Sequence, residues 1–419
     1  SAPVPVPDTV IDRALVLHRR HVAQRRAVAG SAAVVVLLSA VIVVWATRST
    51  SGEGRISSAG ATTSAPVAST TATAETTTVP ATGEGNPGHR FVALPPNPRG
   101  AVTRAAVVWT GTEAWAVGGE GSTVAAGIDA YNPATQQWRV VSADVPVPGE
   151  PLVIAADSTV VLLGRDGARV AVFQAGADYP ALVADYPLAA LDAIDRHVPA
   201  VWNGHEVLVW PTAADPTLGV TAADPVAFDP VARTFRSLAH VPIAPRSRAA
   251  SVWTGTEWIV WGGTDGADQF ADGAAYDPAT DTWRVLAESP LSARRAPGVW
   301  TGTELLVATG ASGGDSTGNG EMALSDGAAY DPATDTWRPI AFGLAHPGFT
   351  PIWTGAELLL FAKGGAVWYD PVLDQWSSGE FVWGDVPHDD SSPVWTGEVV
   401  LLLGSYDGST GGATFTVPK

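Results

Sequence analysis

Arginine, histidine and acidic side chains recur at one step of a repeated pattern in this sequence. Arg104, Arg248 and Arg295 each stand five residues before a tryptophan, and His197 and Asp390 occupy the same step in two further copies. A planar guanidinium binds carboxylate or sulfate groups through two parallel hydrogen bonds. If the copies close into a ring, these five side chains gather around one opening, and we expect a ligand-binding rim there.

The same positions allow two other interpretations. Each arginine could pair with an Asp or Glu of the neighbouring copy and only hold the ring together. Asp390, Glu150 and His197 are the acid or base candidates at this step, so a carbohydrate-active or lyase-type enzyme is the main alternative to a binding protein. No nucleophile motif or phosphate-binding loop stands out, and we expect no catalytic residues.

Residues that could bind a metal are scattered. Six histidines after residue 80 stand singly, and the acid-rich segments 265–272 and 315–321 lack the spacing of an EF-hand or a comparable calcium loop. The chain contains no cysteine, which excludes disulfides, thiol catalysis and cysteine-bound metals. We therefore expect no metal site and no cofactor.

The element that must position these side chains is a unit of four short strands, clearest at residues 250–286. Its first hairpin carries a Trp-x-Gly turn, and a degenerate copy of that hairpin lies at 155–164. Its second hairpin carries two aromatic residues separated by six others. The plain copies of the first hairpin begin at Trp109, Trp202, Trp253, Trp300, Trp353 and Trp395. One such sheet cannot bury both faces alone, so the copies must stack on one another.

A diglycine after the second strand, followed by the paired aromatic residues, resembles the kelch repeat. Gly118-Gly119, Gly262-Gly263 and Gly364-Gly365 carry the doublet, and Tyr276 and Trp283 illustrate the aromatic pair. The resemblance, which extends to the central domain of galactose oxidase, implies an all-β propeller but not a single function, because such propellers include binding modules and enzymes. The radical copper chemistry of that family needs a Cys-Tyr crosslink, which a chain without cysteine cannot form.

The two ends of the repeated region are each incomplete. Residues 90–95 look like the fourth strand of a unit that lacks its first three, and the last copy ends after a third strand at 413–417. Together they make one unit and leave no free edge at the closure. We expect a seven-bladed kelch-like β-propeller over residues 90–419, monomeric and closed by the strand at 90–95.

The segment before the propeller indicates a membrane anchor. Residues 1–26 are rich in arginine, residues 27–47 form an uncharged stretch long enough to span a bilayer as one α-helix, and residues 48–89 are a Ser/Thr/Pro-rich stalk that we expect to be disordered. The arginine excess predicts a cytoplasmic N-terminus and an extracytoplasmic propeller. A cleaved signal peptide is the alternative. The Ala, Val, Gly and Arg usage is typical of a bacterium with GC-rich DNA.

The net charge of −18 argues against nucleic acid as a partner. The sequence therefore predicts a single-pass cell-membrane protein whose propeller is a non-catalytic binding or sensing module for a protein or glycan ligand. Besides the enzyme, one more alternative is a transmembrane regulator that couples the propeller to a cytoplasmic partner. The nature of the ligand is not readable from the sequence.

Overall fold

The computed structural model describes most of the propeller region and none of the chain before it. The described residues are 90–100, 105–119, 127–147, 151–164, 169–177, 180, 182–185, 198–210, 224–313, 320–343, 350–362, 365–378, 393–404 and 410–417. The expected segments 1–26, 27–47 and 48–89 lie outside them, as do Arg104, His197 and Asp390. Within the described ranges, no helix is long and apolar enough to cross a bilayer.

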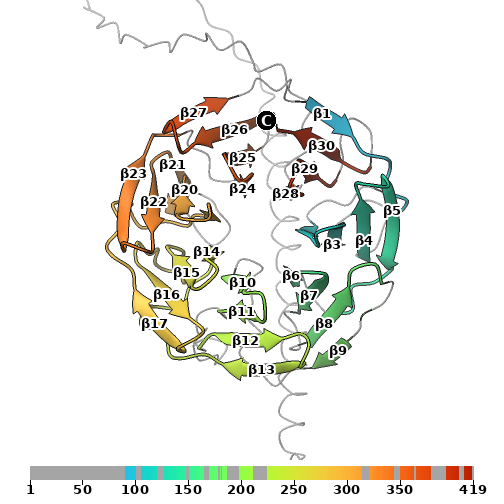
Figure 1. Cartoon of the computed structure of the whole chain (residues 1–419), viewed down its shortest axis with the longest axis horizontal. Coiled ribbons are helices and arrows are strands. Elements are labelled where there is room, and N and C mark those ends of the chain that lie inside the picture. The colour runs from blue at the N-terminus through green and yellow to red at the C-terminus, as the bar shows by residue number, and fades with distance from the viewer. Residues whose placement is uncertain are drawn as a thin grey trace, which may run out of the picture. The chain divides into compact units, whose positions relative to one another are not determined.

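The described residues form a seven-bladed β-propeller (Figure 1). Each blade is a four-stranded antiparallel sheet, and the strands of a blade follow one another outward from the central axis. This confirms the all-β, seven-bladed fold expected from the repeats. No helix is present in the described part of the chain.

The first three blades follow in chain order from residue 106. Their strands are β2 (Ala106–Trp109), β3 (Ala114–Gly118), β4 (Gly127–Asn132) and β5 (Gln137–Ser142); β6 (Leu152–Ala156), β7 (Thr159–Leu163), β8 (Arg169–Gln174) and β9 (Leu182–Asp185); and β10 (Ala200–Trp202), β11 (Val207–Val209), β12 (Val226–Asp229) and β13 (Thr234–Ser237).

Blades four to six repeat the arrangement. Their strands are β14 (Ala250–Trp253), β15 (Trp258–Trp261), β16 (Gly273–Asp277) and β17 (Thr282–Val285); β18 (Val299–Trp300), β19 (Leu305–Val307), β22 (Gly327–Asp331) and β23 (Thr336–Ile340); and β24 (Thr350–Trp353), β25 (Leu358–Ala362), β26 (Gly365–Asp370) and β27 (Gln375–Ser378).

The seventh blade joins the two ends of the propeller region. Its strands are β28 (Pro393–Trp395), β29 (Val399–Leu402) and β30 (Ala413–Thr416), with β1 (Arg90–Ala93) as the outermost strand. β1 pairs antiparallel with β30 over four residues, from Arg90 opposite Thr416 to Ala93 opposite Ala413. The ring is therefore closed by backbone hydrogen bonds between segments more than 300 residues apart, which appear blue and red in Figure 1.

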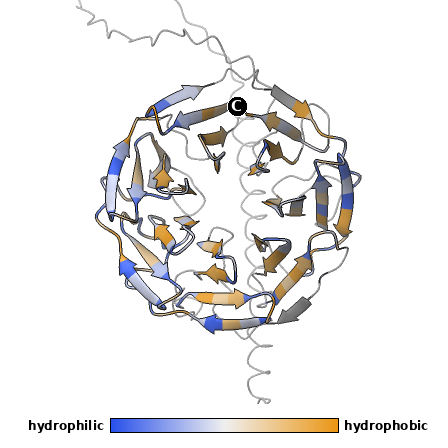
Figure 2. Ribbon diagram, in the orientation of Figure 1, coloured by the Kyte–Doolittle hydropathy of each residue, from blue (hydrophilic) through white to orange (hydrophobic). Residues whose placement is uncertain are grey.

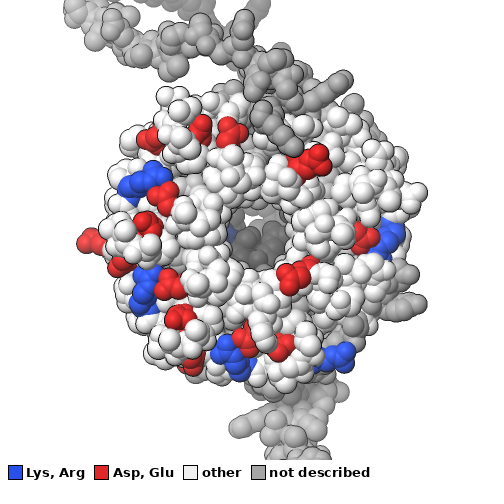
Figure 3. Space-filling model, in the orientation of Figure 1, with Lys and Arg blue, Asp and Glu red and all other residues white. Residues whose placement is uncertain are grey.

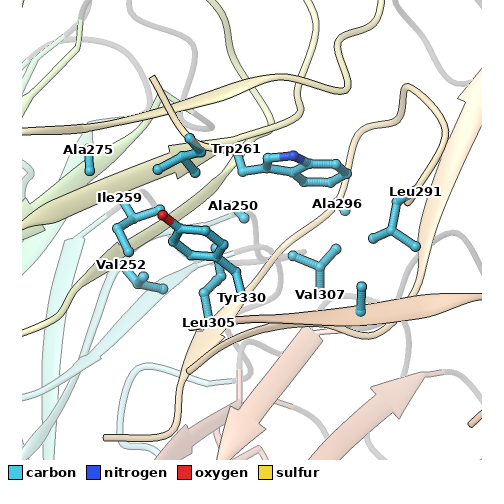
Figure 4. Close-up of a cluster of buried hydrophobic side chains, with 12 residues drawn as sticks. Ala250, Val252, Ile259, Trp261, Ala275, Leu291, Ala296, Leu305, Val307 and Tyr330 are labelled. Carbon is cyan, nitrogen blue, oxygen red and sulfur yellow. The ribbon is translucent and has the colours of Figure 1, made fainter. Parts of the chain in front are cut away.

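The hydrophobic core consists of layers between neighbouring blades. One layer packs Trp261 of blade four against Leu305, Val307 and Tyr330 of blade five (Figure 4). The inner strands are the more apolar and the outer strands the more hydrophilic (Figure 2). A single blade buries its two faces only by contacting both neighbours, which explains why the sequence repeats.

Antiparallel order places the loops of every blade on two faces. We call the face with the turns between strands one and two and between strands three and four the turn face. The opposite face, with the loops between strands two and three and the connections between blades, is the loop face. Between strands two and three of blade five, the chain forms a two-stranded hairpin of β20 (Gly310–Gly313) and β21 (Glu321–Leu324) on the loop face.

Candidate functional site

Arg295, one of the expected rim residues, lies at the loop face with its side chain inside the protein. The side chain is 7% exposed. Its Nη2 lies 2.6 Å from Oε1 of Glu321 and donates a 2.7 Å hydrogen bond to the carbonyl of Gly313. Its backbone also exchanges two hydrogen bonds with Ala311. Arg295 thus fixes the β20–β21 hairpin of its own blade, and its buried Nε lacks a hydrogen-bond partner.

Arg248 is the other expected rim residue that the structure describes. Its side chain is half-buried and its φ is +54°, a left-handed conformation that is uncommon for a residue other than glycine. It lies beside Ser247, which pairs with Thr264 of the loop in the same blade. The structure thus keeps Arg248 near the surface while Arg295 is enclosed. Arg104, His197 and Asp390 lie outside the described residues, so the five-residue rim remains a prediction.

Two arginines that the sequence analysis did not select are more deeply buried. The side chains of Arg246 and Arg294 are both 0% exposed. Arg294 donates from Nη1 and Nη2 to the two carboxylate oxygens of Asp326, each at 2.8 Å. Arg246 donates from Nη1 to the Asp272 carboxylate at 2.8 Å. In both blades the acidic residue stands directly before the third strand, so the arginine closes the end of the long loop.

The equivalence of these arginines was hidden by one additional residue. Arg246 stands seven residues before Trp253, whereas Arg294 stands six residues before Trp300. The chain accommodates the additional residue before β14, where Arg248 has its left-handed φ. The sequence feature that could have identified both arginines is their acidic partner, because each pairs with the Asp of an Asp-Gly dipeptide at the start of strand three. This dipeptide occurs at 272–273 and at 326–327.

Blades four and five are also joined through their loops. The Gly263 amide donates to the Arg294 carbonyl at 2.8 Å, and the Arg294 amide donates to the Phe270 carbonyl at 3.1 Å. A Cβ on Gly263, whose φ is +94°, would lie 2.6 Å from the carbonyl oxygen of Ser247. The second glycine of the doublet is therefore required by a close approach of two backbone segments.

Arg246 is further enclosed by aromatic rings. Its guanidinium carbon lies 4.4 Å from the centre of the Phe270 ring and 5.8 Å from that of Trp210. Burial lowers the pKa of Arg246, and the Asp272 carboxylate opposes this effect. The positive charge is held between a carboxylate and two aromatic faces, an arrangement that supports the loop and leaves little of the guanidinium for a ligand.

A second set of charged side chains links the blades on the turn face. In blade four, Arg284 donates to the two carboxylate oxygens of Glu257 at 2.9 and 2.7 Å. Its Nη1 donates to the hydroxyl of Tyr330 in blade five at 2.8 Å. That hydroxyl donates to Asp335 at 2.5 Å, and Asp335 accepts the Ala287 amide of blade four at 3.0 Å. We call this Glu-Arg-Tyr-Asp arrangement the latch.

The Glu-Arg pair of the latch recurs at other junctions in the described part of the ring. The Glu-Arg pairs are Glu113 with Arg139, Glu206 with Arg236, Glu257 with Arg284, and Glu304 with Arg338. Figure 3 shows acidic and basic side chains lying side by side around the outer part of the ring, whereas the surface near the central opening is mostly uncharged. These pairs could be predicted from the sequence, because each Glu stands four residues after the tryptophan of the first hairpin. Each Arg directly follows the second aromatic residue of the second hairpin.

Ionisation of the latch follows from its hydrogen bonds. The hydroxyl of Tyr330 holds the pKa of Asp335 below its usual value, and the Ala287 amide acts in the same direction. Burial raises the pKa of Tyr276 to about 12, with Arg236 opposing this effect and Asp281 adding to it. The pKa of Arg284 is raised, chiefly by Glu257. Around neutral pH the latch between blades four and five therefore contains a charged Arg284, a charged Asp335 and a neutral Tyr330.

The described residues show no cluster of three or more side chains that could hold a metal ion. A comparison with models of known protein families, and another with curated proteins, gives no match.

Proposed function

We propose that this chain is a single-pass membrane protein whose extracytoplasmic, kelch-type propeller is a non-catalytic binding or sensing module for a protein or glycan. The observation that carries this proposal is the construction of the loop face in blades four and five. Arg246, Arg294 and Arg295 each bind an acid of a long loop in their own blade. Loops held in one conformation lose less entropy when a ligand binds, which favours recognition.

The ligand face of this proposal is the loop face. Arg248 is its half-buried charged residue, and Met322 of β21 is 64% exposed beside the hairpin that Arg295 supports. Arg104, His197 and Asp390 complete the proposed rim by their place in the repeat. The full chain in detergent, displayed against arrays of glycans and of envelope proteins, tests the proposal. Capture of a ligand that Arg248→Glu abolishes without lowering the melting temperature supports it. Failure to capture any member of either array contradicts it.

The membrane anchor rests on the uncharged stretch 27–47 and on the arginines before it. Since the chain has no cysteine, single cysteines are unambiguous reporters. An impermeant maleimide added to intact cells should label Ser58→Cys and not Ala14→Cys. Labelling of Ala14→Cys alone would reverse the orientation. Labelling of neither position in cells, with both labelled after lysis, would place the propeller in the cytoplasm.

A further inference from the structure

The junction between blades seven and one lacks the latch. In the strand register, Val400, Phe415 and Phe91 of blade seven take the places of Trp258, Tyr276 and Trp283 of blade four. Val399 therefore stands in the place of Glu257, and Val92 in the place of Arg284. Both charges of the pair are therefore replaced by valine. The Tyr of the latch is retained as Tyr131.

The remaining parts of the latch change with them. Gln136, with a φ of +54°, stands where blade five has Asp335. The indole of Trp138 donates to the Pro95 carbonyl at 2.9 Å, as the indole of Trp337 donates to that of Ala287. Pro95 stands in the place of Ala287 but has no amide hydrogen to donate. It therefore needs no acceptor such as Asp335, which accepts the Ala287 amide. The junction is neutral at every latch position.

A groove lies at this junction. A groove of about 820 Å³ extends outward from Trp109 past Tyr131 to Val92 and Pro95. The corresponding groove between blades four and five is about 580 Å³. Glu257 lines it, but no residue of β17, the outermost strand that carries Arg284, does. Both volumes fall within the range typical of small-ligand sites, but of the two only the groove between blades seven and one reaches the outermost strand. We call it the seam groove.

One hydroxyl group at the seam groove has no hydrogen-bond partner among the described residues. Tyr131 lines the groove and is 2% exposed. Its hydroxyl makes no hydrogen bond to a described residue, whereas those of Tyr330 and Tyr276 donate to an aspartate. Burial alone raises the pKa of Tyr131. A ligand that supplies a partner to this hydroxyl gains a hydrogen bond.

The lining indicates the chemistry of the occupant. Among the described residues that line the groove there is no Lys, Arg or His, and Glu398 at an exposed turn is the one charged residue of this set. The walls are apolar and aromatic (Val92, Val399, Trp109), and amide and hydroxyl side chains are interspersed (Asn132, Gln136, Thr396). A pyranose has an apolar C–H face and an edge of hydroxyl groups, which matches this combination. Anionic groups are disfavoured because the described lining offers no cation to bind them.

We propose that the seam groove binds an uncharged pyranose unit of a glycan, with Tyr131 as a hydrogen-bonding residue and Trp109 as an apolar wall. This inference rests on the proposed binding function and places a second ligand site on the turn face, opposite the loop face. The groove is built from both ends of the propeller region, because Val92 belongs to β1 and Val399 to β29. Ring closure and the ligand site therefore depend on the same strand.

The experiment uses the full chain in detergent with neutral disaccharides as probes: cellobiose, maltose, lactose, trehalose and N,N′-diacetylchitobiose. Saturation-transfer NMR and tryptophan fluorescence report binding. At least one probe should bind with a Kd on the order of 1 mM. The double variant Val92→Arg/Val399→Glu rebuilds the latch pair, and it should weaken that binding at least about tenfold. Tyr131→Phe should weaken it about fivefold, while Tyr330→Phe, the matched change at the junction of blades four and five, should leave it unchanged.

The outcomes separate this proposal from the broader one. Absence of saturation transfer from all five disaccharides overturns the seam groove as a sugar site, and so does binding that the double variant retains. Capture of a protein or glycan that survives the double variant supports the binding function and rejects the groove. If the double variant does not fold, as judged by its circular dichroism, the comparison of Tyr131→Phe with Tyr330→Phe decides alone: equal affinities overturn the proposal.

Discussion

The hydroxyl of Tyr330 in blade five lies 2.8 Å from Nη1 of Arg284 in blade four. This one contact joins an ion pair within blade four to a carboxylate in blade five, because the hydroxyl also donates to Asp335. Neighbouring blades are thereby linked by polar groups on the turn face as well as by the apolar layer between them. The strength of this link can be measured.

Replacing Arg284 with methionine should lower the free energy of unfolding by about 2 kcal/mol, because Glu257 and the Tyr330 hydroxyl lose a charged donor in a partly buried setting. Urea unfolding of the full chain gives the value. Glu288→Gln changes an exposed charge in the same blade and should shift the stability by less than about 0.5 kcal/mol. Equal effects of the two substitutions would show that the latch is not stabilising.

The loop-face arginines should separate into structural and surface residues. Arg295→Glu places a second carboxylate beside Glu321 in a buried position and should cost about 3 kcal/mol or more. Arg294→Met leaves Asp326 without its partner and should cost about the same. Arg248→Glu, at a half-exposed side chain, should cost clearly less than either. Thermal melting of the three variants measures the difference, and three similar losses would remove Arg248 from the proposed rim.

The latch should fail in acid. The pKa of Asp335 is lowered in the folded protein, so its contribution to stability is complete above the unfolded value of about 3.9. It is lost as the pH falls through the folded pKa. Asp335→Asn, which tolerates the left-handed φ of +52° at this position, should melt below the wild type at pH 6. The two melting curves should converge near pH 2, and a difference that does not vary with pH would contradict the assignment.

Ring closure should depend on β1. A chain that begins at Gly100 lacks the partner of β30, the Trp138–Pro95 hydrogen bond and the bond from Asn97 to Asp129. Compared with a chain that begins at Ala81, it should melt about 5 to 10 °C lower. It should also form soluble oligomers, since β30 becomes an open sheet edge. Differential scanning calorimetry and size-exclusion chromatography test this; identical melting temperatures would mean that β1 is dispensable.

The sequence by itself determined the repeat and therefore the fold. The Trp-x-Gly turns and the paired aromatic residues recur along the chain, and incomplete units stand at the two ends of the repeated region, at 90–95 and 413–417. A ring of stacked four-stranded sheets satisfies these spacings. These features are local, because strand periodicity and turn chemistry act over a few residues. Seven blades with a shared seventh could therefore be counted before any coordinates were known.

The tertiary structure decided which charged residues hold the propeller together. Arg246 and Arg294 differ by one position in the repeat, so fixed spacing selected Arg248 and Arg295 in their place. Their equivalence appears only in contacts with Asp272 and Asp326, which long loops separate from them in sequence. The seam groove is likewise a property of two distant strands, since Val92 and Val399 meet only when the ring closes. Pairing across such distances depends on how the blades stack, which local sequence does not encode.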